Sequence, residues 1–383
     1  MAAFVNPYNF VRSEYDASKG AAPLAHDRLH VAHYSGRMAC TLTTITRVTT
    51  KSFEPRRGMC IYGSTLKGMV RVVAEAVAQG CFPLGGNACQ NAQRLCICCR
   101  MFGWLKEGNV HLGRVQIRDA TPQGRNWLVT DATYIEWQAL SSPKRHPAFY
   151  STADGRPRGR KFYYHHNPDE PEQKVTSSSR TRSGDPNESI AIAKAGETFD
   201  VRVDFTDLTS AELGLLLYAL LLEEGLYHKV GKGKPLGFGT VHITLDTLSV
   251  LPPDRYEQWD TRLTPVAALS PSALGLASEQ THALPGTAVT EAAWSQLTPE
   301  QKTALFIQTQ MEHFFQAQFY KSYGQRFELP HMQDMRHLLS LHPTYPIHYP
   351  PREWFNRNAQ VSLPTAYEVE GAPPGDRSAW LQE

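Results

Sequence analysis

The chain lacks the features of membrane-bound, secreted and nucleotide-hydrolysing proteins. Its 383 residues contain no run of 18 apolar positions, and the start MAAFVNPYNFVRSEY has no signal-peptide pattern. The glycine-rich segment GKGKPLGFG does not end in the GKS or GKT of a nucleotide-binding P-loop, and it precedes a strand pattern rather than a helix. We therefore predict a cytoplasmic protein that has no membrane partner and does not bind ATP.

Two zinc-dependent patterns are also missing. The chain has no HExxH motif, which argues against a catalytic zinc of the metalloprotease kind. It has neither the C2H2 spacing nor a dimerisation heptad, which argues against a zinc-finger DNA-binding protein. Because 41% of the residues are hydrophobic and 20% are charged, the composition predicts a folded globular chain rather than a disordered one.

Charge is unevenly distributed along the chain. Residues 1–249 carry 30 Lys and Arg against 23 Asp and Glu, whereas residues 250–383 carry 9 against 14. A basic first part indicates a polyanionic partner, and an acidic second part is typical of a protein contact or of plain solvation.

Hydrophobic periodicity predicts an α+β fold. Alternating patterns at 36–49, 199–208 and 240–250 indicate half-buried strands, and shorter strand patterns lie around 110–118 and 128–137. Helical spacing follows at 64–80, with Ser64 as N-cap and Gly80 as C-cap, and at 210–226 and 298–324, where Thr298 and Pro299 fit a helix start. The order strand, helix, strands, strand, helix, strand predicts a ferredoxin-like core.

Composition predicts two parts, 1–250 as the core and 251–383 as a partly helical C-terminal extension. The core carries two insertions, a cysteine-rich segment at 81–99 and a basic segment at 141–195 that is rich in Pro, Gly, Ser and Arg.

Five cysteines fall within the cysteine-rich segment. Clustered thiols in a reducing compartment indicate metal rather than disulfides, and Cys96 and Cys99 form a CxxC pair that Cys81 and Cys89 complete to four ligands. We predict one structural Zn²⁺ and no ligand role for Cys98. Cys40 and Cys60 are isolated in the sequence and fit reduced buried cysteines.

Basic residues form three candidate RNA contacts. Ser64, Lys67 and Arg71 lie at the start of one predicted helix, whose N-terminus favours phosphate; an ordinary capped helix with a solvated basic face fits the same spacing. Glycines and lysines interleave between an apolar helix and a strand, where backbone and charge together suit a phosphate chain. These residues are Lys229, Gly231, Lys232, Gly233 and Lys234.

The basic insertion interleaves cations with aromatic side chains, the combination that binds single-stranded RNA. A charged flexible loop is the competing interpretation. The candidate contacts are Lys144, Arg145, Arg158, Arg160, Lys161 and Tyr163.

Several ordered pieces of the sequence resemble the RAMP superfamily of CRISPR proteins, in particular its type III-D-like or type VII-like guide-binding backbone subunits. The pieces are FVNPYNFVR, IYGSTLKGMVR, LCICCRMFG, GRVQIRDA, RGRKFYYHH, FDVRVDFTDLTSAELGLLL and GKGKPLGFGTV, which span roughly residues 4–245 in the family's order.

The resemblance implies a ferredoxin-like RNA-recognition core with an inserted zinc finger and a thumb hairpin. It further implies subunits that stack as copies along crRNA, hold target RNA and assemble with other CRISPR effector subunits. By the same resemblance, Ser64, Lys67 and Arg71 approach guide phosphates, and the glycine-rich segment packs beside them.

One departure from the family bears on catalysis. Family members that cut target RNA carry an aspartate between the first strand and the GSxLKG helix. Residues 46–63 of this chain contain no aspartate, and their one acidic residue is Glu54. We therefore expect a non-catalytic scaffold with a separate nuclease. An endoribonuclease of the same superfamily is the alternative. It would either cut target RNA through an acid such as Glu54, Asp16 or Asp27, or process guide precursor with His and Tyr as general acid and base, the candidate histidines lying near the first strand and at 165–166.

Overall fold

The computed structural model describes residues 7–27, 29–50, 53–54, 58–82, 88–123, 133–137, 150–151, 155, 158–170, 188–252, 262–277, 289–341, 347 and 349. Lys144 and Arg145 lie outside these residues.

An antiparallel sheet forms the base of the molecule. Its strands run in the order β13 (His228–Lys229), β14 (Thr240–Val250), β2 (Tyr34–Thr44), β12 (Thr198–Leu208) and β7 (Val115–Ile117). Helix α1 (Gly63–Val77) follows β2, and α4 (Ser210–Leu221) follows β12. The chain order β2-α1-β7-β12-α4-β14 with the spatial order β14-β2-β12-β7 is the ferredoxin-like arrangement that the sequence predicted.

Strand alternation determines which side chains enter the core. On β12, Phe199, Val201 and Val203 are buried on the helix side of the sheet, whereas Asp200 and Arg202 lie on the other side. Helix α4 is apolar all round because it contacts the sheet on one side and α6 (Pro299–Phe319) on the other.

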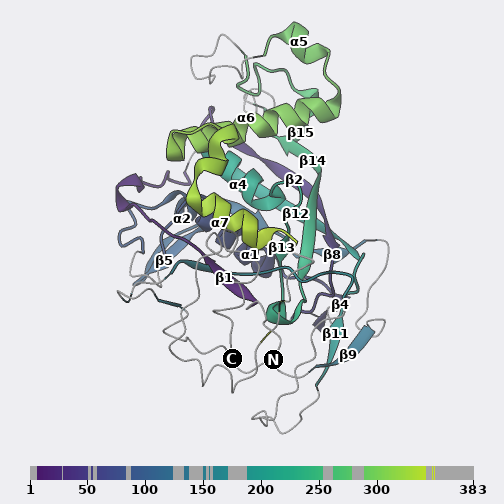
Figure 1. Ribbon diagram of the computed structural model, residues 1–383. Helices are drawn as coiled ribbons and strands as arrows, with labels where there is room; N and C mark the ends of the chain where they lie inside the picture. The colour runs from purple at the N-terminus through teal and green to yellow at the C-terminus, as the bar shows by residue number, and fades with distance from the viewer. Residues whose placement is uncertain are drawn as a thin grey trace.

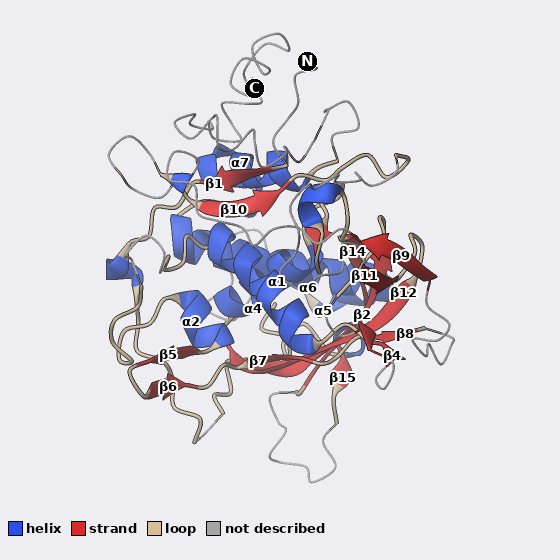
Figure 2. Ribbon diagram, turned by 90° about the horizontal axis from the view of Figure 1, so that it is seen from below, coloured by secondary structure: helices blue, strands red, loops and turns tan. Residues whose placement is uncertain are grey.

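A further layer covers the helices. Strand β1 (Tyr8–Val11) pairs with β10 (Arg160–Tyr163), and α7 (Pro330–Leu339) packs on both. Figure 2 shows the main sheet, the helices and the β1–β10 pair as successive layers. Figure 1 shows α6 lying across α4, where a Cβ at Gly214 would come within 2.0 Å of the Gln310 carbonyl oxygen. Buried Phe306, Phe314 and Phe315 place α6 in the same core as the sheet.

Short elements complete the fold. They are β3 (Phe53–Glu54), β4 (Gly58–Met59), α2 (Ile97–Phe102), β5 (Trp104–Lys106), β6 (Asn109–His111), β8 (Thr121–Pro122), β9 (Thr133–Trp137), β11 (Glu188–Ile192), β15 (Thr264–Pro265) and α5 (Glu291–Ser295). Strands β9 and β11 pair antiparallel, as do β3 with β4 and β5 with β6. Across the described residues, every helix is too short or too polar to cross a membrane.

The ends of α1 differ from the sequence prediction. The helix begins at Gly63, so Ser64 is an exposed residue of the first turn and not the N-cap. The Gly63 N–H instead donates to Asp119 Oδ1 at 2.7 Å, and a Cβ at Gly63 would lie 2.0 Å from the Ile117 carbonyl oxygen. The C-cap is Ala78 rather than Gly80. The prediction failed at the start because the capping carboxylate comes from a distant segment. The predicted cap Thr298 at α6 is confirmed.

Candidate metal centre and nucleic-acid interface

Four buried cysteines converge as the sequence predicted. The Sγ atoms of Cys81, Cys89, Cys96 and Cys99 all lie within 4.8 Å of one another, and those of Cys81 and Cys99 are 3.5 Å apart. A tetrahedral Zn²⁺ with Zn–S bonds of ~2.3 Å requires sulfur–sulfur distances of about 3.8 Å. The four thiols therefore fit one structural zinc, and their number leaves no ligand position for water.

Hydrogen-bond donors surround these sulfurs. The Cys96 N–H donates to Cys89 Sγ at 3.2 Å, Arg71 Nη2 lies 3.8 Å from Cys99 Sγ, and the Tyr15 hydroxyl lies 3.6 Å from Cys89 Sγ. Donors directed at ligand atoms are typical of a metal site, because they stabilise the thiolate form. A hydrogen bond with the Cys81 thiol lowers the pKa of Cys89 to about 6.

Cys98 has a different environment from its neighbours. It is fully buried and lies against Gly80, where an added Cβ would come 3.1 Å from Cys98 Sγ. A hydrogen bond to Cys96 and burial hold the pKa of Cys98 well above its ordinary value. Cys98 is therefore a packing residue beside the metal centre rather than a member of the four-thiol cluster.

A carboxylate on α1 connects this centre to β10. Glu75 accepts from Arg71 at 2.8 Å and from Arg160 at 2.7 Å, and Arg160 also donates to the Gly80 and Cys81 carbonyl oxygens. The sequence placed Arg71 and Arg160 among the RNA contacts. In the structure both guanidinium groups are engaged inside the chain, and Arg160 is buried, so they position the four-cysteine cluster.

The exposed first turn of α1 retains two of the predicted RNA-contact residues. Ser64 is exposed and Lys67 is half-buried. Burial, and then the positive charge of Arg71, lower the pKa of Lys67. Among the described residues, Lys67 has no carboxylate partner, which leaves its charge available to an anion.

The glycine-rich segment packs against the chain that leaves β2. The Lys232 N–H donates to the Thr49 carbonyl oxygen at 2.9 Å, and the Gly239 N–H donates to the Arg47 carbonyl oxygen at 2.8 Å. Gly231 has φ +80°, and a Cβ there would lie 2.2 Å from the Thr49 carbonyl oxygen. Glycine is required at this position because both the backbone angle and the close approach exclude a side chain.

The three lysines of this segment have different environments. Lys229 is buried, and its ammonium donates to Thr240 Oγ1 at 3.1 Å, whereas Lys232 is exposed. Lys234 follows Gly233, which has a left-handed backbone, and it is largely enclosed, so that burial lowers its pKa. Of the three, Lys232 is the open surface cation.

Aromatic rings surround Lys161 on β10. Its Nζ lies 3.7 Å from the Tyr8 ring centroid and 4.8 Å from that of Tyr163, and it donates to the Tyr150 hydroxyl at 2.8 Å. Arg158 precedes this strand, where its N–H donates to the Tyr150 carbonyl oxygen. The sequence predicted Lys161 and Tyr163 as RNA contacts in an insertion without regular structure, whereas both lie on strand β10. Tyr8 and Tyr150 were missed because other segments supply them.

The open face of the sheet carries an arginine cluster that the sequence analysis did not name. Asp204 lies 2.8 Å from Arg37, 3.0 Å from Arg202 and 3.3 Å from Arg118. Burial alone would raise the pKa of Asp204, but hydrogen bonds from Arg37 and Arg202 lower it. The alternation of polar residues on β2 and β12 was a signal for this cluster.

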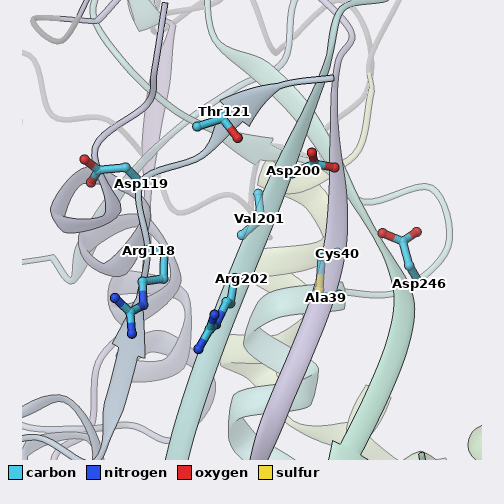
Figure 3. A pocket seen from close by; sticks show the side chains of 9 residues that line it. All are labelled: Ala39, Cys40, Arg118, Asp119, Thr121, Asp200, Val201, Arg202 and Asp246. Carbon is cyan, nitrogen blue, oxygen red and sulfur yellow. The ribbon is translucent and has the colours of Figure 1, made fainter. Parts of the chain in front are cut away.

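Beside the cluster the sheet forms a shallow hollow. Figure 3 shows Arg118 and Arg202 on neighbouring segments, with carboxylates on three sides. These carboxylates belong to Asp119, Asp200 and Asp246. Mixed charge makes this hollow a poorer phosphate surface than the lysine-rich segments.

Two histidines near the first strand contact a buried carboxylate. His30 Nδ1 lies 3.0 Å and His33 Nδ1 3.2 Å from Asp207, which also accepts from Arg114 at 2.8 Å. Burial alone would raise the pKa of Asp207, but hydrogen bonds from His30 and the charge of Arg114 lower it. The spacing of the three side chains resembles a metal site, yet Arg114 already neutralises the carboxylate, which disfavours a cation there.

Comparisons with known proteins complete these observations. A sequence model of the RAMP superfamily matches residues 41–242, just over half of the chain. A chain of the solved structure titled "Type IV-B CRISPR Complex" aligns at 16% identity over 55% of this chain and 90% of that chain, with a TM-score of 0.32. A search among curated proteins found no match.

Proposed function

Because the chain belongs to the RAMP superfamily, we propose that it is a guide-RNA-binding backbone subunit of a CRISPR ribonucleoprotein effector. In this proposal copies of the chain line up along crRNA and hold target RNA, and a separate nuclease among the other subunits cuts it. The observation that carries the proposal is the family match, which extends from β2 to the start of β14 and so includes α1, α4 and the glycine-rich segment.

Charge and geometry support RNA as the ligand. Lys67 and Lys232 are exposed or half-buried cations, and Lys232 lies in a glycine-rich segment with closely packed backbone. Residues 1–249 carry an excess of Lys and Arg. Such cations bind the phosphate groups of RNA and not its bases. The affinity for RNA is therefore expected to depend strongly on salt concentration and little on base sequence.

The proposal assigns the inserted elements as follows. The four-cysteine segment is a structural zinc finger whose metal holds α2 against α1. The antiparallel pair β9–β11 is the base of the thumb, because it brackets most of the basic insertion in the sequence. Lys144 and Arg145 belong to this insertion and remain proposed contacts. The assembly itself is of a type III-D-like or type VII-like kind.

RNA binding tests the proposal directly. Purified protein is mixed with fluorescent single-stranded RNAs of unrelated sequence, and affinity is measured across salt concentrations by anisotropy. Lys67→Ala and Lys232→Ala are each expected to weaken all RNAs alike and to reduce the salt slope by about 0.7. Lys302→Ala is the matched control, since Lys302 lies over the Trp294 ring on the acidic C-terminal part. Wild-type protein that binds no RNA would refute the function.

The histidine pair supports one alternative, an endoribonuclease. His30 and His33 have ring centroids 4.8 Å apart and are oriented by Asp207, as general acids and bases are oriented by carboxylates. Guide-loaded protein is incubated with labelled RNA, with and without Mg²⁺. The scaffold proposal predicts intact RNA, whereas cleavage that His33→Ala abolishes and His242→Ala leaves unchanged would establish the nuclease.

A further inference from the structure

Two lysines from separate segments act on each other electrostatically, and among the described residues neither is paired with a carboxylate. Lys161 lies on β10, and Lys234 lies in the short helix of the glycine-rich segment. The two segments are in contact, because a Cβ at Gly237 would lie 3.3 Å from the His166 ring. Burial lowers the pKa of Lys161 to about 8, and the charge of Lys234 adds to the effect. Among the ion pairs of the described residues, neither lysine has a partner.

The described groups around Lys161 do not supply negative charge. Its near neighbours are the phenol rings of Tyr8, Tyr150 and Tyr163. Burial raises the pKa of Tyr150 and of Tyr163, and Tyr349 acts on both in the same direction. The phenols therefore stay neutral near pH 7. They give cation–π and hydrogen-bond contacts but leave the positive charge uncompensated.

Enclosing two ammonium groups without a counter-charge opposes folding, since burial and mutual repulsion both disfavour the charged form. Clusters of this kind occur where a ligand supplies the missing charge. Elsewhere in the same region Arg160 has a carboxylate partner, Glu75. The absence of such a partner is thus specific to the Lys161 side of β10.

We infer that Lys161 and Lys234 together form a binding site for one phosphate group of the RNA backbone, with the tyrosine rings as its walls. Neutral rings beside two cations suit a phosphodiester, because the adjoining sugar and base present apolar faces that pack on them. The identity of the polyanion depends on the proposed function, whereas the anion site follows from the two lysines alone.

The first test separates binding from folding. Lys161→Met and Lys234→Met keep the length of each side chain and remove the charge, so each variant is expected to fold as stably as wild type or better. Each is expected to bind a fluorescent single-stranded RNA at least about tenfold more weakly, as loss of a charged hydrogen bond predicts. Lys302→Met is the control and is expected to bind as wild type. Unchanged affinity in both folded variants overturns the inference and leaves the proposed function standing.

The second test uses a small anion and does not depend on RNA. The lysines are converted to ¹³C-dimethyl-lysines, and the signal lost in Lys161→Arg identifies Lys161 in the NMR spectrum. Addition of pyrophosphate is expected to raise the pKa of Lys161, because an anion favours the charged amine. If RNA raises the pKa of Lys161 and pyrophosphate does not, the site binds a nucleic-acid backbone only. If the protein binds no RNA but pyrophosphate raises the pKa of Lys161, the anion site stands without the proposed function. If neither probe raises the pKa of Lys161, the anion site is refuted.

Discussion

Arg160 and Lys161 are neighbours on β10, but their side chains lie on opposite faces of the strand and contact different groups. Arg160 is buried against Glu75 and the carbonyl oxygens that precede the metal centre. Lys161 lies among tyrosine rings and has no carboxylate partner in the part of the chain that the structure describes. Because successive side chains of a strand point in opposite directions, one basic dipeptide contributes to two different environments.

The difference teaches that a cation's partners, and not its charge, separate structural from binding residues. A paired, buried guanidinium satisfies the groups around it, so its removal leaves a carboxylate and two carbonyl groups without their donor. The Lys161 ammonium contacts only neutral phenols among the described residues, so its removal leaves no carboxylate without a partner. The first should matter for folding, and the second for ligand binding.

The largest expected effect concerns the metal on the Arg160 side. Cys99→Ala is expected to lose zinc and to unfold residues 88–102, since a structural zinc contributes on the order of 10 kcal/mol in small zinc domains. Cys98→Ala is the matched control one residue away. It is expected to retain one zinc per chain by metal analysis. Equal zinc content in the two variants would contradict the assigned ligand set.

A smaller effect is expected from the ion pair itself. Arg160→Met should lower the free energy of unfolding by about 3–5 kcal/mol, because it leaves buried Glu75 with Arg71 alone. Lys161→Met should change the free energy of unfolding by less than about 1 kcal/mol. Urea denaturation of the two variants measures both values. A larger loss in Lys161→Met than in Arg160→Met would reverse the comparison.

The smallest effect is a change of stability with pH. The pKa of Lys161 falls from 10.5 to about 8 in the folded state, so between these values the unfolded chain holds a proton that the folded chain has lost. Stability should therefore rise as pH increases from about 8 towards 10.5. The rise should be weaker in Lys161→Met. Denaturation midpoints at pH 7.5, 8.5 and 9.5 check this, and a rise unaltered by the substitution would contradict it.

Local patterns predicted the elements better than their ends. The alternation of β12 and the cap at Thr298 were read correctly because both depend on residues close in sequence. The start of α1 was misjudged because Asp119, 56 residues away, supplies the acceptor for Gly63. The four-cysteine set was predictable since the ligands lie within a short segment, and a thiol cluster there has few other uses.

The sequence by itself determined the α+β order of elements, the four thiols and the excess of positive charge in the first 249 residues. Periodicity, ligand type and charge are properties of neighbouring residues, so no fold is needed to recognise them. Only the tertiary structure decided which lysines and arginines pair with carboxylates of the same chain. Glu75 reaches Arg160 across 85 residues, and Lys234 approaches Lys161 from the glycine-rich segment. Those partners are fixed by packing between distant segments, which no local pattern encodes.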